Sequence, residues 1–116
     1  MSDESKGCMR KARRRLERAR EDLRDEAYES CVHNAYYSAY WSARACLMLR
    51  RVHPRTHEGL ISMFGLHFIK SSEVDKRYGR ILNFLKDLRM KANYEALEET
   101  SRGEAEEAVR DAEEFL

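Results

Sequence analysis

The chain has 116 residues, of which 37% are charged and 42% are hydrophobic, and its formal net charge is +1. A chain of this length is expected to form one domain with one modest core. One Pro and five Gly are too few for the frequent turns of an all-β fold, and this composition also argues against a disordered chain.

Segments for membranes and export are not evident in the sequence. No run of 18 apolar residues occurs, so we expect no membrane contact. Residues 1–20 are charged and lack the apolar centre of a secretory signal. The three cysteines, an odd number in a chain without an export signal, are therefore expected to be free thiols in the cytoplasm.

Two long helices are predicted in the first half of the chain. Apolar residues at helical spacing predict the first helix over about residues 6–27. The second helix, about residues 28–51, is apolar on most of its sides and is predicted to be central. Its small polar residues Asn34, Ser38 and Ser42 recur at every fourth position and could let a neighbouring helix approach closely. Pro54 ends this helix.

Three further helices are predicted after Pro54. Thr56 is a candidate N-cap for a short helix that extends to about Phe68. A fourth helix is predicted over about residues 73–97, with Ser72 and Asp75 at capping-box spacing. Ser101 and Glu104 predict a capping box for a fifth helix. The prediction is thus all-α: a single domain, residues 1–116, that forms an antiparallel up-and-down bundle of four to five helices.

The net charge hides an asymmetry between the two ends of the chain. Residues 6–24 contain nine basic and three acidic residues, for a local charge of +6, and residues 95–116 contain nine acidic and two basic residues, for −7. The basic segment could bind RNA, a nucleotide or an acidic partner. The two segments could instead be solvated helix faces that attract each other within the fold, which is the interpretation we favour.

Arg89 is a charged residue at an apolar position of the predicted fourth helix. On a helical wheel it falls inside the apolar stripe formed by Tyr78, Ile81, Leu82 and Leu85. A guanidinium is always charged and is costly to bury without a partner. Its stem could pack while its head reaches water or a carboxylate. Alternatively, it could face a pocket or an interface and bind an anion such as phosphate.

Metal and cofactor motifs are absent from the sequence. His53 and His57 have the spacing of a ligand pair, but Pro54 lies between them, and no cysteine pair has zinc spacing. No glycine-rich phosphate loop occurs. We therefore expect no metal and no cofactor. Arg51 and His57 have five residues between them, but this pair also crosses Pro54, so we interpret His57 as a residue that caps or packs at the start of the third helix.

Four segments, in order along the chain, resemble one branch of the HEPN superfamily of nucleotide-binding domains. The segments are Asn34-Ala35-Tyr36-Tyr37-Ser38-Ala39-Tyr40-Trp41-Ser42-Ala43-Arg44-Ala45, Thr56-His57-Glu58-Gly59-Leu60-Ile61-Ser62-Met63-Phe64, His67-Phe68-Ile69-Lys70 and Leu88-Arg89-Met90-Lys91-Ala92-Asn93-Tyr94. Together they cover roughly residues 10–97. Each segment alone is weak, and their order makes the resemblance fairly specific.

The resemblance implies a helical bundle that is usually a homodimer. Such proteins are often encoded beside a minimal nucleotidyltransferase and act with it as a toxin–antitoxin-like pair. Many are metal-independent ribonucleases whose pocket holds an Arg followed four to six residues later by a His. Here Arg89 stands at the Arg position, Tyr94 stands where the His would be, and Asn93 replaces an Asp of the branch.

These substitutions set the functional expectations. Tyrosine, with a pKa near 10, is a poor base at neutral pH, so we expect a pocket that binds RNA or nucleotide, with Arg89 and Asn93 as ligand-binding residues. One alternative is a metal-independent ribonuclease with Arg89 and Tyr94 as its catalytic pair. Another is a non-catalytic helical scaffold. The apolar stripe Tyr37, Trp41 and Met48 is the predicted dimer or partner surface.

Overall fold

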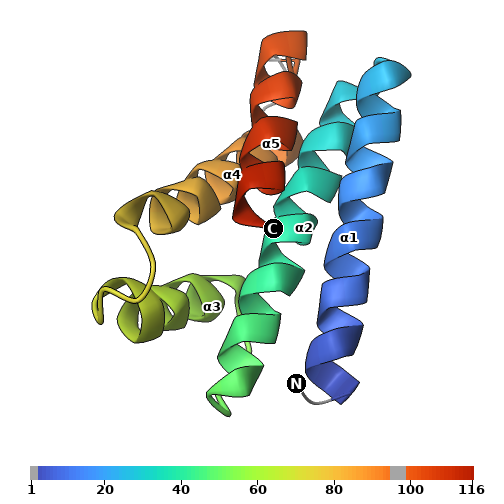
Figure 1. Ribbon diagram of the computed structural model, residues 1–116. Helices are drawn as coiled ribbons and strands as arrows, with labels where there is room; N and C mark the ends of the chain where they lie inside the picture. Colours follow the sequence, from blue (N-terminus) through green and yellow to red (C-terminus); the bar gives the residue numbers. More distant parts are fainter. Residues whose placement is uncertain (1–2, 95–98) are drawn as a thin grey trace.

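Helices build the part of the chain that the computed structural model describes, residues 3–94 and 99–116 without the side chains of residues 93 and 94 (Figure 1). They are α1 (Asp3–Arg24), α2 (Tyr28–Leu49), α3 (His57–Phe64), the π-helical segment η1 (Gly65–Ile69), α4 (Lys76–Tyr94) and α5 (Arg102–Phe115). No strand occurs within these residues. The all-α prediction is therefore confirmed.

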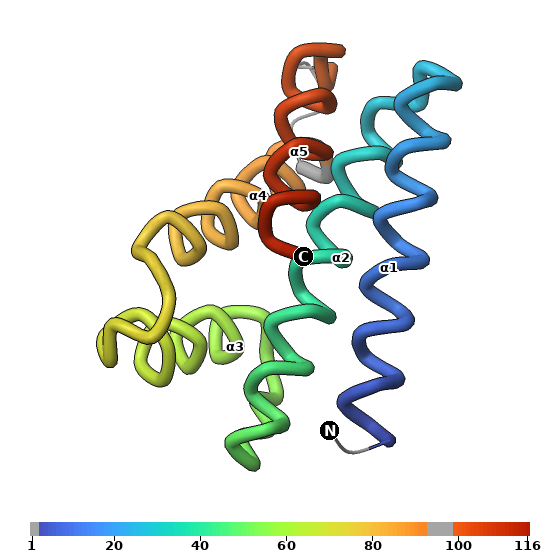
Figure 2. The backbone as a smooth tube through the Cα atoms, viewed as in Figure 1, coloured from blue at the N-terminus to red at the C-terminus, as the bar shows by residue number. Residues whose placement is uncertain are grey.

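The second helix is central, as its apolar sides predicted. It contacts α1, α3, α4 and α5. Figures 1 and 2 show α1 and α2 side by side and antiparallel, with α5 beside them, while α3 and α4 extend to one side. The α2 side chains in the core include Val32, Tyr36 and Leu47, each fully buried. A helix that is buried on several sides has apolar residues on most of its faces, which explains the sequence pattern of α2.

Small polar residues at the contact between α1 and α2 let the two helices approach closely. Ser38 is fully buried and its hydroxyl donates to the backbone carbonyl of Ala12 across 2.8 Å. Ser5, also fully buried, donates to the carbonyl of Ala45 across 3.0 Å. Both hydroxyls thus have an acceptor, so their burial leaves no polar group unpaired.

Thr56 fixes where α3 begins. Its side-chain oxygen accepts the backbone N–H of Gly59 at 2.9 Å, which confirms the predicted N-cap. A Cβ atom at Gly59 would lie 2.9 Å from the same oxygen, so glycine is required for the cap to close. His57 is the first residue of α3, and its position follows from this cap. After Phe64 the helix widens into η1, where the N–H of Lys70 donates to the carbonyl of Gly65.

The start of α4 differs from the prediction. The expected capping box of Ser72 and Asp75 does not form, because Ser72 has a positive φ of 62° outside the helix. Instead the carboxylate of Asp75 accepts the backbone N–H of Arg77 at 2.9 Å. The helix consequently begins at Lys76, three residues later than predicted. Its predicted end at residue 97 lies outside the described residues.

Among the helices of residues 3–94 and 99–116, none combines the length and the apolar character needed to cross a bilayer.

The capping box of α5 yields a stability prediction. Ser101 accepts the N–H of Glu104, and the Glu104 carboxylate accepts the N–H of Ser101, as the sequence predicted. Ser101→Ala removes one of these bonds and should lower the free energy of unfolding by about 1 kcal/mol, the usual cost of losing such a cap. Urea unfolding followed by circular dichroism measures this. Ser62→Ala, at an exposed position within α3, is the control and should change the unfolding free energy by less than about 0.5 kcal/mol.

Candidate functional site

Arg89 lies half-buried on α4 with its guanidinium against α2. Its Nη1 donates to the hydroxyl of Tyr37 at 3.1 Å. Its Nε is buried and has no hydrogen-bond partner. Within the described residues, Arg89 forms no ion pair with a carboxylate. Of the two alternatives that the sequence left open, pairing of Arg89 with a carboxylate does not occur among the described residues, and anion binding by Arg89 stays a prediction.

Aromatic rings of α2 hold the Arg89 guanidinium in place. Its central carbon lies 5.0 Å from the ring centre of Tyr36 and 5.5 Å from that of Tyr37. The two rings meet edge to face, 5.2 Å apart, and Tyr40 packs against both. Contacts of a cation with ring faces attract the charge without neutralising it. Among the described residues, the site therefore keeps a net positive charge.

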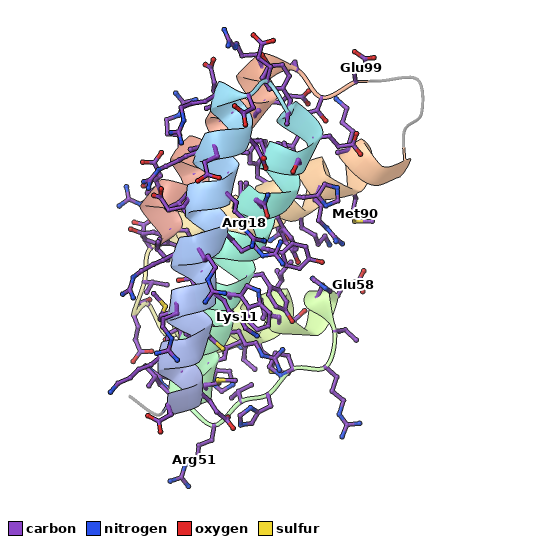
Figure 3. The ribbon with its side chains drawn as sticks, turned by 90° about the vertical axis from the view of Figure 1, so that its right-hand side faces the viewer. Lys11, Arg18, Arg51, Glu58, Met90 and Glu99 are labelled. Carbon is purple, nitrogen blue, oxygen red and sulfur yellow. The ribbon has the colours of Figure 1, made fainter. Side chains whose placement is uncertain are left out.

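His57 completes the site from α3. Its Nδ1 lies 2.6 Å from the hydroxyl of Tyr36, and its ring stacks 5.6 Å from the Tyr36 ring and 4.7 Å from that of Tyr40. The structure thus brings His57 and Arg89 to the same tyrosine. The sequence analysis paired His57 with Arg51 only to discount the pair, and that rejection holds, because Arg51 is exposed beyond the end of α2 and points away from the molecule (Figure 3).

Burial and charge set the ionisation of the site. Burial and, secondarily, the positive charge of Arg89 lower the pKa of His57 below its usual value, so the imidazole is neutral at pH 7. Burial raises the pKa of Tyr36, so its hydroxyl stays protonated. A neutral imidazole beside a fixed cation can accept a proton from a ligand whose anionic group binds the cation.

Arg15 connects this site to α1. Its Nη1 donates to the Oδ1 atom of Asn34 at 3.0 Å, and its guanidinium lies 5.3 Å over the Tyr37 ring. Tyr37 therefore contacts two arginines, Arg15 of α1 and Arg89 of α4. The basic segment of α1 consequently reaches the site. The opposite charges of the chain ends also attract each other, since Arg20 of α1 pairs with Glu113 of α5 at 3.0 Å.

The other sequence-predicted residues have different outcomes. The side chains of Asn93 and Tyr94 lie outside the described residues, so their roles stay predictions. Tyr37 belongs to the Arg89 site. Trp41 lies under Lys11, and Met48 accepts a weak hydrogen bond from the thiol of Cys8 at 3.7 Å. Because α1 covers part of this stripe, the dimer surface on Tyr37, Trp41 and Met48 also stays a prediction.

Thiols and metal ligands offer no second site in residues 3–92 and 99–116. Burial raises the pKa of all three cysteines, that of Cys31 to about 12. The thiols are free and protonated at neutral pH, hence poor nucleophiles. No group of three or more potential metal ligands gathers in this part of the chain.

His57 is the site residue that sequence reasoning missed. Its partner Tyr36 is 21 positions earlier in the chain, a separation that no helical periodicity connects. One signal was available: the Thr56 cap and Gly59 define the start of α3, so His57 is its first residue. That signal alone gives the place of His57 along the chain and not its neighbours on α2 and α4.

Comparison with known proteins gives the following matches. A family model described as "HEPN domain" matches residues 5–116. A candidate toxin of Methanocaldococcus jannaschii is 36% identical over 74 residues, which is 64% of this chain and 54% of that protein. A second candidate toxin of that organism is 32% identical over 73 residues, or 63% and 50% of the two chains. A UPF0332 protein of Pyrococcus horikoshii is 45% identical over 40 residues, or 34% and 28%. The chain spans about half or less of the length of these relatives.

The proximity of Arg89 to His57 predicts a measurable pKa change. Arg89→Ala removes a positive charge that disfavours the imidazolium, so the pKa of His57 should rise toward about 6.5. NMR titration of the imidazole protons measures it, with His57→Gln assigning the signal. In the wild type, the depressed pKa also means that stability is lost as the pH falls below about 6.5, because the unfolded chain then binds the proton first. A His57 pKa that stays constant or falls in Arg89→Ala would contradict the proposed electrostatic contact.

Proposed function

This chain belongs to the HEPN domain family, as its sequence motifs predicted, and we propose that it is a toxin-like HEPN component that binds RNA or a nucleotide at the Arg89 site. The names of two relatives, both candidate toxins, support the toxin-like role. Three free thiols support a reducing, cytoplasmic setting.

One observation carries the proposal: the half-buried side chain of Arg89 has no carboxylate partner among the described residues. Within the described residues, the Arg89 guanidinium contacts the rings of Tyr36 and Tyr37 and the Tyr37 hydroxyl, and its Nε has no acceptor. A phosphate would supply both the missing negative charge and acceptor oxygens, and a guanidinium matches its geometry. The surrounding tyrosines offer ring faces against which a base or a ribose can pack.

The partners in this proposal come from the family resemblance. We propose a homodimer whose interface adjoins Tyr37, Trp41 and Met48, and a small nucleotidyltransferase as the antitoxin-like partner. The three residues are each half-buried in the single chain, which leaves part of their surface for a second protein. Co-purification of the tagged chain with a small nucleotidyltransferase encoded beside it tests the second partner, and light scattering tests the first.

The binding function predicts a specific loss in Arg89→Ala. Removing a charged hydrogen-bond donor should weaken the binding of a fluorescent single-stranded RNA by about 1.5–3 kcal/mol, or roughly 10- to 150-fold in Kd. Arg80→Ala is the matched control, because Arg80 is an exposed arginine of the same helix. Fluorescence anisotropy measures both, and circular dichroism verifies folding. Equal Kd values for the wild type and a folded Arg89→Ala would remove Arg89 from the binding site.

A second candidate function is metal-independent RNA cleavage, and the position of His57 favours it. His57 and Arg89 converge on Tyr36, and the imidazole is neutral at pH 7. The imidazole would take the proton of a ribose 2′-hydroxyl, whose oxygen then bonds to the adjacent phosphorus. The phosphorus–O5′ bond breaks, the 5′-oxygen takes a proton from water, and a 2′,3′-cyclic phosphate remains. Arg89 would stabilise the negative charge that grows on the phosphate. In this function His57, rather than Tyr94, is the base.

The cleavage function predicts which variants stay active. In EDTA, a labelled single-stranded RNA should be cleaved by the wild type and by His53→Gln, an exposed-histidine control. His57→Gln should lower the cleavage rate at least about 100-fold, the lower end of the contribution of a general base. An RNA with a single 2′-deoxy position should resist cleavage there. No wild-type cleavage would leave binding as the function, and cleavage by His57→Gln at the wild-type rate would exclude His57 as the base.

A further inference from the structure

We propose that a groove between α1 and Trp41 is a subsite for single-stranded RNA, in which a base stacks on Trp41 while phosphates follow the arginines of α1. The groove, named here the α1 groove, is lined by Lys11, Arg14, Arg15, Arg18 and Trp41. The proposal rests on the proposed function, because it adds a path by which the strand that binds at Arg89 continues along the molecule.

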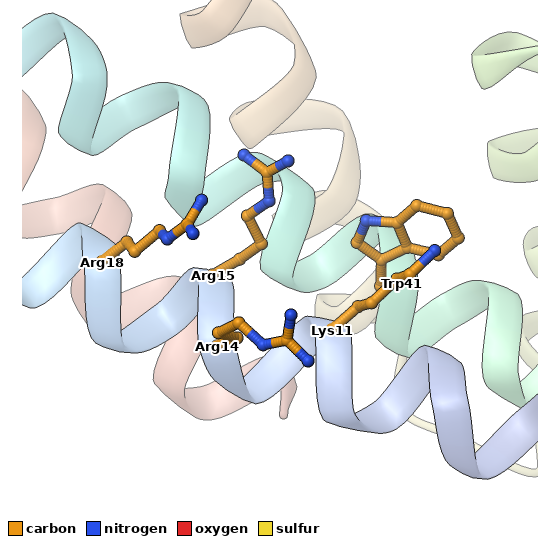
Figure 4. A pocket seen from close by; sticks show the side chains of 5 residues that line it. All are labelled: Lys11, Arg14, Arg15, Arg18 and Trp41. Atoms are coloured by element: carbon orange, nitrogen blue, oxygen red, sulfur yellow. The ribbon is translucent and has the colours of Figure 1, made fainter.

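Helical spacing puts the basic residues of the α1 groove on one face. Lys11, Arg14, Arg15 and Arg18 stand at positions i, i+3, i+4 and i+7 of α1. They enclose, with Trp41, a cavity of about 170 Å³. Figure 4 shows Arg15 and Arg18 extended toward α2, with Lys11 beside the indole. The row spans about 10 Å along the helix axis, the length of about three stacked nucleotides at about 3.4 Å each.

The charge of the α1 groove is not neutralised by the fold. Lys11, Arg14 and Arg18 form no ion pair with any carboxylate in the described part of the chain. By contrast Arg20, two residues further along α1, pairs with both Glu17 and Glu113. Within α1, Arg20 thus forms ion pairs inside the fold, whereas the basic residues of the α1 groove form none with the residues described. A row of unpaired cations on one helix face is the electrostatic pattern of a phosphate-binding surface.

Trp41 supplies a surface on which a base can stack. The indole is half-buried, and the edge-to-face contact with Tyr40, 5.2 Å between ring centres, fixes its orientation. The Nζ atom of Lys11 lies 4.4 Å above the indole ring. The guanidinium of Arg44 also lies near the indole, 5.8 Å from the ring centre. Contacts of a cation with a partly exposed ring are weak, so a nucleobase can displace Lys11, and the freed ammonium can then contact a phosphate. Base stacking on an aromatic side chain is the stronger of the two contacts.

Contacts through Tyr37 connect the α1 groove with the Arg89 site. Arg15, which lines the groove, lies 5.3 Å over Tyr37, and Tyr37 accepts the hydrogen bond from Arg89. In the other direction, Arg15 and Arg18 also line a cavity of about 660 Å³ beside Tyr28, His33 and Asn34. One strand could therefore contact Arg89, Tyr37, Arg15 and Arg18 in succession.

The chemistry of the groove favours RNA over an acidic helix of a second copy. The acidic candidates lie on α5, but several of their carboxylates are already paired within the chain: Glu104 with Lys91, Glu113 with Arg20 and Glu114 with Arg77. A carboxylate side chain also has no ring to place on Trp41. An unpaired strand has both phosphates and exposed base faces, whereas a duplex keeps its bases stacked on each other.

Trp41 allows a direct test, because it is the only tryptophan of the chain. Titration of the wild type with a decamer of uridine at low salt should quench the tryptophan fluorescence and shift it as the base stacks. A decamer of abasic ribose phosphate should bind without the same quench. Each phosphate contact of a single strand contributes about −0.7 to the slope of log K against log salt, which counts the contacts along α1.

Three variants separate the parts of the α1 groove. Trp41→Leu should raise the Kd for the uridine decamer about 5- to 100-fold, the range of one lost base stack. The double variant Arg14→Ala, Arg18→Ala should reduce the salt slope by about 1.4. Arg13→Ala removes the same charge from an exposed position of α1 outside the groove, and it should leave both the quench and the Kd close to those of the wild type.

The outcomes distinguish this inference from the proposed function. If Trp41→Leu and the double arginine variant bind RNA as the wild type does while Arg89→Ala does not, the α1 groove is excluded and the Arg89 site stands. If the fluorescence changes with protein concentration alone and RNA has no effect, a second copy occupies the groove and the inference is overturned. If no variant changes the binding of RNA, both proposals are wrong.

Discussion

The contact between the Arg89 guanidinium and the rings of Tyr36 and Tyr37 is the interaction on which the rest of the site depends. A carboxylate would have fixed the arginine and cancelled its charge. Aromatic rings fix it and leave the charge available, at the cost of an Nε without an acceptor. The contact needs α2 and α4 in register, and the hydrogen bond between Tyr36 and His57 brings α3 into the same arrangement.

Neighbouring residues of one segment of the central helix α2 contact two different helices, α1 and α3. Ser38, fully buried, closes the distance to α1 through its hydrogen bond with Ala12. Tyr36 and Tyr40, two positions before and after Ser38, point toward α3, and their rings pack against the ring of His57. Small residues on one face bring α1 close enough for Arg15 to reach Tyr37. The packing of α1 on α2 is therefore also what brings the basic face of α1 to the site.

Much of the fold was predictable because its signals are local. Apolar spacing along α1 and α2, the Thr56 cap and the Ser101–Glu104 box depend on residues within one or two turns. The start of α4 was not, since Ser72 leaves the helical region and Asp75 caps alone. The π-helical turn after Phe64 was also missed, because an i+5 hydrogen bond leaves no distinct apolar period.

The site was predictable only in part. The helical wheel placed Arg89 on an apolar stripe, which indicates that its charge needs a partner or access to water. It could not name Tyr36, Tyr37 and His57, because those contacts join three helices whose packing is a property of the whole chain. Helix packing also determines that Arg89 has no carboxylate partner in the described part of the chain. The sequence contains 21 acidic residues, and none of those described forms an ion pair with Arg89.

The shared tyrosine has an energetic consequence. Tyr37 contacts Arg15 through its ring and Arg89 through both its ring and its hydroxyl. Two groups that bear on one side chain do not act independently, so the free energies of changes at Arg15 and Arg89 are expected to be non-additive. The two guanidinium groups also repel each other across the Tyr37 ring, and a bound anion would lower this repulsion for both. An anion bound beside one of these arginines would therefore also lower the repulsion at the other, so binding at α1 and binding at α4 are expected to be energetically coupled.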